Sequence, residues 1–321
     1  MTEADKSRTA AIYLALLVFL FAVAAARLAY VRLSPAPLSS DASYLWPVIL
    51  LLVGAFCTFR DYPLVGNLFN ALGLTYVAFV GAFESAALVL YTGRDFPMID
   101  ASLAAFDHAL GFDWIAYMKW FDRHPFVARL AAHAYNSIFA QPFVVIVVLV
   151  LVRQTERVYG LIAMMVLALT VTSVAAVFLP ALGAYPFFQL TPADHPHISM
   201  PLHGAWVAPI EWLREAAFKS PMPPIDSGLI SFPSYHSATA VLYIWAAWRT
   251  PVFKWVMLAL NIAMLLATPL HGSHYFVDVI AGIAVAVITI AATLWAFRRI
   301  AQMAPGALLA KPRTGYRIAE P

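Results

Sequence analysis

Two polar stretches interrupt an otherwise strongly apolar chain, and both contain histidine. They read SFPSYHSATA at residues 231–240 and HGSHYFVDVIAG at residues 271–282. In the second stretch His274 and Asp278 are four residues apart, so on a helix their side chains share one face. A carboxylate that accepts the proton of one imidazole nitrogen fixes the tautomer and leaves the other nitrogen as a nucleophile. The spacing therefore predicts nucleophilic catalysis by His274, oriented by Asp278.

His236 in the first stretch could supply the acid and base that such chemistry needs, by protonating a leaving oxygen and then deprotonating an acceptor. Ser234 and Ser237 fall in the first turn of a predicted helix, where free N–H groups and the helix dipole favour an anion such as phosphate. Together these residues predict phosphoryl transfer. For each residue alone a structural role is also open, such as a histidine bonded to a carbonyl or a serine that only caps its helix.

The rest of the chain must position these groups, and its composition indicates how. Of 321 residues, 62% are hydrophobic and 12% are charged, whereas a soluble domain has roughly 45–50% apolar and about 25% charged residues. We therefore expect an all-α, polytopic membrane helix bundle. The net charge of +3, without a run of Lys or Arg, gives no indication of nucleic-acid binding. The single cysteine, Cys57, excludes an internal disulfide and a thiolate metal site.

Apolar windows of about 20 residues predict eight transmembrane helices. They form an N-terminal pair within residues 1–60 and a six-helix catalytic core within 61–300, followed by a polar tail at 301–321. An amphipathic stretch at about 98–122 predicts a helix on the membrane surface. The eight predicted spans are roughly 10–30, 44–59, 65–91, 127–152, 157–180, 233–249, 252–270 and 275–297.

The span order places both polar stretches at one membrane face, because the sixth and seventh spans cross the bilayer and return. Lys and Arg are more numerous in the short loops on the side of the termini, which predicts that both termini are cytoplasmic. The 181–232 loop and the two histidine stretches are then extracytoplasmic.

The motifs PSYHSA and HGSHYFVDV resemble the second and third signature motifs of the type 2 phosphatidic acid phosphatase superfamily. The HYFVD wording and the upstream ALGFDW resemble in particular the branch containing fungal inositol phosphorylceramide synthase. The resemblance implies a phosphohistidine at His274, an orienting base at Asp278 and a general acid at His236. It also implies a lipid phosphate or phospholipid substrate, within a bilayer.

Two phosphate-binding arginines of the superfamily's phosphatases have no counterpart here. The first motif, a lysine followed by an Arg-Pro pair, is absent, and Thr268 stands where the third motif would carry its arginine. This departure favours the transferase branches, in which another group must neutralise the phosphate. On the predicted face the candidates are His271, Arg214 and Lys219, although such charges also simply extend toward lipid headgroups.

Other functions remain open at this stage. One is a lipid phosphate phosphatase that acts on phosphatidic acid or a polyprenyl diphosphate. Another is a transporter in which Glu84, in the middle of the third span, forms a proton relay with the histidines. We expect neither a metal nor another cofactor, because the one acid–histidine cluster has irregular spacing with intervening prolines. That cluster comprises Asp194, His195, His197 and His203.

Overall fold

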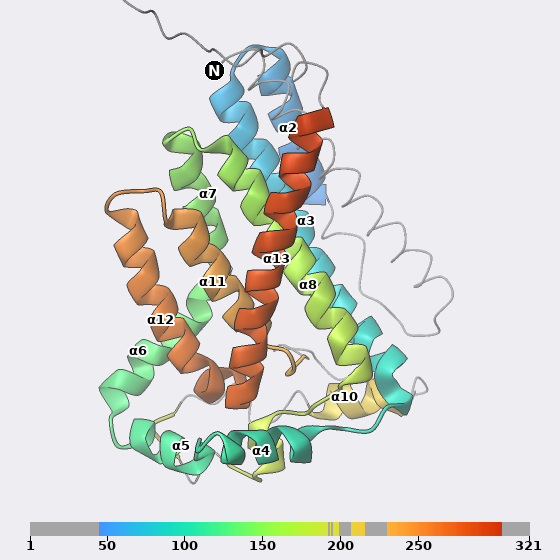
Figure 1. The fold of residues 1–321 in the computed structure, drawn as a ribbon, viewed down its shortest axis with the longest axis vertical. Helices are drawn as coiled ribbons and strands as arrows, with labels where there is room; N and C mark the ends of the chain where they lie inside the picture. Colours follow the sequence, from blue (N-terminus) through green and yellow to red (C-terminus); the bar gives the residue numbers. More distant parts are fainter. Residues whose placement is uncertain (1–44, 192, 194, 199–206, 216–229, 304–321) are drawn as a thin grey trace, which may run out of the picture.

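The computed structural model describes residues 45–191, 193, 195–198, 207–215 and 230–303, and every regular element within these ranges is a helix (Figure 1). The predicted all-α class is confirmed. Within the described ranges three single helices are long and apolar enough to cross a membrane, namely α8 (Thr155–Phe178), α12 (Phe253–Gly272) and α13 (Phe276–Met303), and one bent pair of helices could form a fourth span. The chain is thus an integral membrane protein. The predicted total of eight spans stays a prediction, and the first of them, 10–30, lies outside the described residues.

The predicted span 127–152 is broken. It consists of α6 (Pro125–Asn136), a short turn, and α7 (Gln141–Leu151), and the two helices are bent by 62°. Pro142 lies in the first turn of α7, where it has no N–H to donate and its ring opposes continuation of the preceding helix. The Gln141 amide fixes the bend, because it donates to Ser137 Oγ (2.8 Å) and accepts from Asn261 of α12 (2.8 Å).

The predicted surface helix 98–122 is two helices, α4 (Asp100–Ala109) and α5 (Trp114–Asp122). The break lies at Gly111, whose φ of 78° is open to glycine at little steric cost. Asp113 then starts α5 by accepting a hydrogen bond from the Ala116 N–H at 2.9 Å. The two helices lie across the lower end of the bundle (Figure 1).

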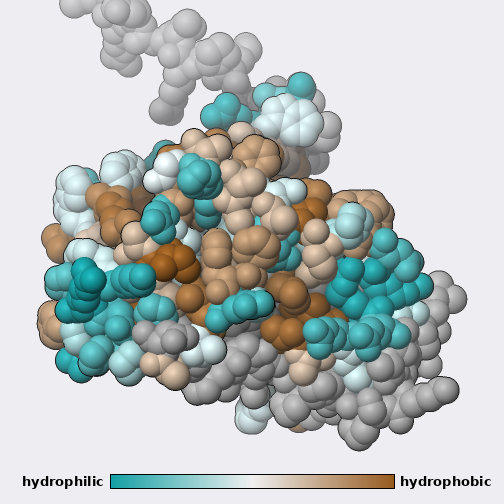
Figure 2. Space-filling model, turned by 90° about the horizontal axis from the view of Figure 1, so that it is seen from below, coloured by the Kyte–Doolittle hydropathy of each residue, from teal (hydrophilic) through white to brown (hydrophobic). Residues whose placement is uncertain are grey.

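This end of the molecule has the mixed surface expected of a membrane interface. Short α10 (Val207–Arg214) lies at the same end as α4 and α5 (Figure 1). Seen from below, hydrophilic side chains gather toward two sides, and apolar side chains lie between them (Figure 2). The stretch predicted to form one amphipathic surface helix thus forms separate helices at this end, and their position on a membrane surface stays a prediction.

Above it, a bundle forms from α3 (Pro63–Thr92), α7, α8, α11 (Tyr235–Ala247), α12 and α13, with α2 (Leu45–Phe59) packed along α3. Its interior is filled by fully buried side chains such as Ile146, Ile162 and Tyr243. Large apolar side chains also face outward, as Val287 (57% exposed) and Trp295 (62% exposed) do on α13. Lipid tails accommodate such a surface, because only the helix backbone needs hydrogen bonds there.

The two histidine stretches meet where α11 and α13 begin. Ser234 donates its N–H to the Asp278 carbonyl at 3.1 Å. Gly282 permits this approach, since a Cβ built on it would lie 2.2 Å from the Ser234 carbonyl oxygen. A methyl group cannot fit there without a shift of one helix backbone.

We therefore expect Gly282→Ala to separate the starts of α11 and α13, with a loss of about 1–3 kcal/mol of unfolding free energy and of most activity. Thermal unfolding of the purified protein in detergent and a turnover assay measure the two effects. Ala284→Val, which adds carbon atoms at an exposed position of the same helix, is the control. Wild-type stability and turnover in Gly282→Ala would contradict the close approach.

Candidate active site

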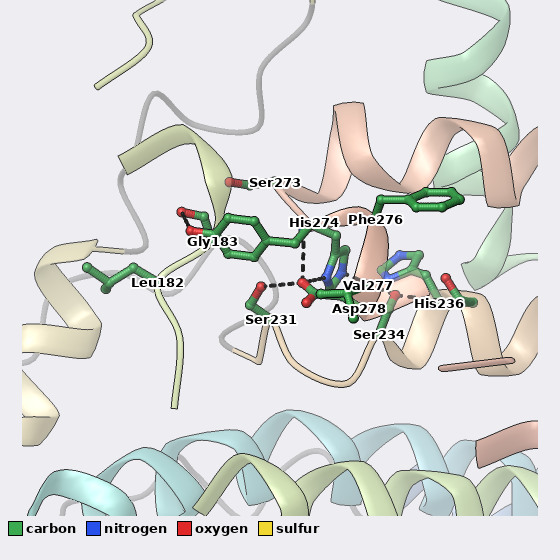
Figure 3. Close-up of polar contacts among 12 residues, drawn as sticks. Leu182, Gly183, Ser231, Ser234, His236, Ser273, His274, Phe276, Val277 and Asp278 are labelled. Atoms are coloured by element: carbon green, nitrogen blue, oxygen red, sulfur yellow. Dashed lines mark hydrogen bonds and ion pairs between the residues drawn. The ribbon is translucent and has the colours of Figure 1, made fainter. Parts of the chain in front are cut away.

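The centre of the site is a buried histidine–carboxylate pair at the start of α13 (Figure 3). The Nδ1 atom of His274 lies 3.1 Å from Oδ2 of Asp278, and the two residues are 4% and 0% exposed. The same oxygen accepts hydrogen bonds from Ser231 Oγ at 2.9 Å and from the Tyr275 N–H at 3.0 Å. Because an ionised carboxylate only accepts hydrogen bonds, the proton of a neutral His274 ring lies on Nδ1. Its Nε2 then carries a lone pair and can only accept a hydrogen bond.

That nitrogen faces the first turn of α11. Ser234 Oγ lies 3.3 Å from His274 Nε2 and also accepts from the Ser237 N–H at 3.3 Å, as a helix cap does. The ring of His236 lies near, with a centroid distance of 6.4 Å to the His274 ring. The structure thus brings together five predicted site residues from two stretches of sequence: Ser234, His236, Ser237, His274 and Asp278.

Two polar atoms in this turn have no hydrogen-bond partner among the described residues. They are Nε2 of His236 and Oγ of Ser237, and both are inaccessible to solvent. Buried polar atoms in native proteins are nearly always paired, so each exception needs an explanation. Both atoms therefore count as unpaired polar groups of the candidate site.

Tyr135 of α6 is a site residue that the sequence analysis missed. Its ring stacks on His236 at a centroid distance of 4.0 Å and an interplanar angle of 10°, and its hydroxyl lies 3.4 Å from His236 Nδ1. Gly272 leaves room for this arrangement, because a Cβ there would lie 2.8 Å from the Tyr135 hydroxyl. From sequence alone, a tyrosine in a largely apolar helix is predicted to be a core residue. The contact between Tyr135 and His236 is evident only from the fold.

Two carboxylates of α4 bind the turn that contains His274 from outside. Asp107 accepts the N–H groups of Phe276 (2.7 Å) and Val277 (2.8 Å), and so caps α13 from another helix. Asp100 accepts the Tyr275 hydroxyl at 3.0 Å. Burial raises the pKa of the Asp107 carboxyl, while its two backbone hydrogen bonds oppose that shift.

The turn before His274 is fixed by two further segments. Ser273 has a φ of 55°, and its carbonyl accepts the Ala184 N–H of α9 (Ala184–Phe187) at 2.7 Å. Asp100 binds the same loop through the N–H of Gly183 at 2.9 Å. The Trp114 indole of α5 donates to the His274 carbonyl at 3.0 Å. The backbone of His274 is therefore held by surface helices as well as by α13.

Of the three predicted phosphate-binding cations, the structure describes Arg214 and His271, and both make other contacts. Arg214 donates to the carbonyls of Gly93 (3.0 Å), Arg94 (3.0 Å) and Phe96 (2.7 Å), and thereby fastens α10 to the end of α3. His271 is buried beside the site, with Nε2 3.2 Å from the Ala128 carbonyl. Lys219 lies outside the described residues.

The remaining predictions fall partly outside the described residues. Asp194 and His203 are not described, and neither is the side chain of Glu84 in α3. His195 is buried, and His197 lies 3.5 Å from the Asp122 carboxylate. Within the described ranges, no group of three His, Cys, Asp or Glu side chains is arranged to hold a metal ion.

Comparison with known proteins gives one family. A family model described as the PAP2 superfamily matches residues 101–292, which is more than half of the chain. The match begins within α4 and ends within α13, so it contains the whole cluster around His274. Neither the curated proteins nor the solved structures give a match.

The cap that α4 provides can be tested with Asp107. Asp107→Ala leaves two buried amides unpaired, which we expect to cost about 1–3 kcal/mol of unfolding free energy and to lower turnover on the order of 10²-fold by misplacing His274. Asp107→Asn keeps one acceptor and should fall between this variant and the wild type. Thermal unfolding and turnover are the measurements.

Asp113→Ala is the matched control, because it removes a carboxylate cap from α5 rather than from α13. It should cost about 1 kcal/mol and leave most turnover. Equal turnover in Asp107→Ala and Asp113→Ala would refute a specific role for the α13 cap.

Proposed function

This chain belongs to the PAP2 superfamily, and from that premise we propose that it transfers the phospho-headgroup of a lipid through a phosphohistidine at His274. Membership supports a lipid phosphatase or phosphotransferase type of function in general. The observation that carries the finer proposal is the pairing of His274 Nδ1 with a buried carboxylate while Nε2 faces the turn that contains His236. We propose that this enzyme is similar to the inositol phosphorylceramide synthase branch, because it contains the HYFVD and ALGFDW sequences and lacks the two phosphatase arginines.

In the first step, Nε2 of His274 attacks phosphorus, and the bond from phosphorus to the leaving oxygen breaks. The leaving oxygen takes a proton from Nε2 of His236. The proton on Nδ1 of His274 stays on the ring, and Asp278 accepts its hydrogen bond. The carboxylate thereby stabilises the positive charge that develops on the His274 ring. Tyr135 supports the role of His236, since its hydroxyl oxygen can accept the Nδ1–H of the His236 imidazolium, and the ring is then neutral after Nε2 has given its proton away.

In the second step, an acceptor hydroxyl attacks the phosphohistidine, and His236 Nε2 removes its proton. The bond between phosphorus and His274 then breaks, which restores the free ring. If the acceptor is an alcohol the enzyme is a transferase, and if it is water the enzyme is a phosphatase.

The negative charge of the bound phosphate must be stabilised by uncharged hydrogen-bond donors, because the two phosphate-binding arginines of the superfamily's phosphatases are missing here. The N–H groups of the first turn of α11 lie beside His236, and a helix N-terminus favours an anion. Such preorganised donors stabilise charge without the reorganisation that water would need. Lys219 stays a candidate for an additional positive charge.

Transfer is favoured over hydrolysis by the enclosure of the site. His274 and Asp278 are buried, and α4, α5 and α9 contact the catalytic turn. A transferase must align its alcohol acceptor and exclude water, and oriented binding in a closed site can do both. The face that holds the site is proposed to be extracytoplasmic, on the distribution of Lys and Arg.

The triad is tested by substitution. His274→Ala should abolish turnover, and Asp278→Asn should lower it on the order of 10⁴-fold by favouring the wrong tautomer. His236→Ala should block a poor leaving group such as a lipid alkoxide, yet partly spare nitrophenyl phosphate, whose leaving group needs no proton. His133→Ala, at an exposed position of α6, should behave as wild type. Near-normal turnover in His274→Ala would refute the assignment.

A second assay distinguishes transfer of the phospho-headgroup to an alcohol from its hydrolysis by water. We expect purified enzyme given a phospholipid donor without an alcohol acceptor to turn over slowly, and an added acceptor such as inositol or a ceramide to accelerate donor consumption. The measurements are donor loss and product mass. Rapid release of a phosphate product that no alcohol changes would instead establish the phosphatase, with the same triad.

A further inference from the structure

A second polar site lies at the other end of the bundle, where α8, α11 and α13 pack together. These helices enclose a cavity of about 190 Å³. Three arginines from three different segments line it, together with two aromatic rings and one carboxylate. The residues are Arg157, Arg249, Arg298, Trp245, Phe297 and Glu156.

Arg157 forms the inner wall of this cavity and is held firmly. Its Nε donates to the Ala246 carbonyl at 3.1 Å, and its terminal nitrogen donates to the Trp245 carbonyl. Its guanidinium also lies 4.3 Å above the Trp245 ring. An arginine fixed by backbone and aromatic contacts is already in position for a ligand, so little side-chain entropy is lost on binding.

Arg249 and Arg298 add positive charge at the open side of the cavity, where both residues are exposed. Within the described part of the chain neither guanidinium donates a hydrogen bond or forms an ion pair, and one carboxylate, that of Glu156, lines the cavity beside the three arginines. Three like charges around a small cavity repel one another, more strongly where the protein lowers the dielectric constant. An anion with several oxygens, such as a phosphate, would remove that repulsion and pair with the guanidinium groups.

The place of the cavity in the membrane indicates the source of the phosphate. At about 1.5 Å per residue, Arg298 lies roughly 30 Å along α13 from Asp278, which is about the hydrocarbon thickness of a bilayer. α13 runs the length of the bundle between the two ends (Figure 1). The arginines therefore lie at the headgroup level of the leaflet opposite the His274 site. The Trp245 and Phe297 rings beside them can contact the part of a lipid's acyl chains nearest its headgroup.

We propose that this cavity binds the phosphate of an anionic phospholipid from the leaflet opposite the catalytic site. The lipid is not consumed, because the described residues that line the cavity include no histidine, serine or cysteine. It links α8, α11 and α13, and two of these helices carry His236 and Asp278. Bound lipid thus stabilises the helices that position the catalytic groups.

The full-length protein, purified in a neutral detergent, tests this site. Phosphatidylglycerol should raise its unfolding temperature in a titration, and phosphatidylcholine or inorganic phosphate at equal concentration should do so much less. Arg298→Gln should weaken the apparent affinity for phosphatidylglycerol about tenfold, as the loss of one charge-assisted hydrogen bond predicts. Arg157→Gln should weaken it at least as much.

Arg299→Gln is the control, since it removes the same charge from the next residue of α13, which does not line the cavity. It should keep the wild-type titration. Equal weakening in Arg298→Gln and Arg299→Gln would show general surface attraction and overturn the site. Equal stabilisation by inorganic phosphate would overturn a lipid ligand. These readouts do not involve turnover, so they stand apart from the test of the His274 triad.

Discussion

The first turn of α13 is the constraint on which the catalytic cluster depends. Asp107 accepts two of its free N–H groups from outside, and within the turn Asp278 accepts three hydrogen bonds on one oxygen. A buried carboxylate is tolerated only when hydrogen bonds compensate for its lost hydration. A partly satisfied polar network is worse than an apolar core. The position of His274 therefore follows from the three hydrogen bonds that converge on Oδ2 of Asp278, whereas Oδ1 is buried without a partner among the described residues.

The network also ties the chemistry to the membrane interface. Its outer members come from α4 and α5, which lie across the end of the bundle, while its inner members come from α11 and α13, which pack through Gly282 (Figure 1). We propose that the phosphate groups of lipids lie at the depth where these two sets of helices meet. The family, a lipid phosphatase and phosphotransferase group in general, is consistent with this placement. The proposed arginine cavity at the far end would clamp the same helices from the opposite leaflet.

Much of this was predictable from periodicity and spacing. Apolar windows predicted the helical class, and the pattern around His236 and His274 predicted that they meet. The role of Asp107 was not predictable, because its partners are backbone amides 169 and 170 residues away, and an acid on an amphipathic helix reads as a solvated charge. Proline and glycine favour helix breaks, and Pro142 and Gly111 lie at two of them. The prediction nevertheless gave one helix in each place, because it rested on the apolar residues of the whole stretch. Arg214 does lie at the predicted face, but its guanidinium donates hydrogen bonds to carbonyl groups at the end of α3.

Mapping the phosphorylated residue during turnover tests the role of His274 most directly. Enzyme mixed with a phospholipid donor is quenched in alkali, which preserves phosphohistidine, and its peptides are sequenced by mass spectrometry. We expect the adduct on His274, with more of it in the absence of an acceptor alcohol and none in Asp278→Asn at early times. An adduct on His236, or one that persists in His274→Ala, would contradict the assignment of His274 as the nucleophile.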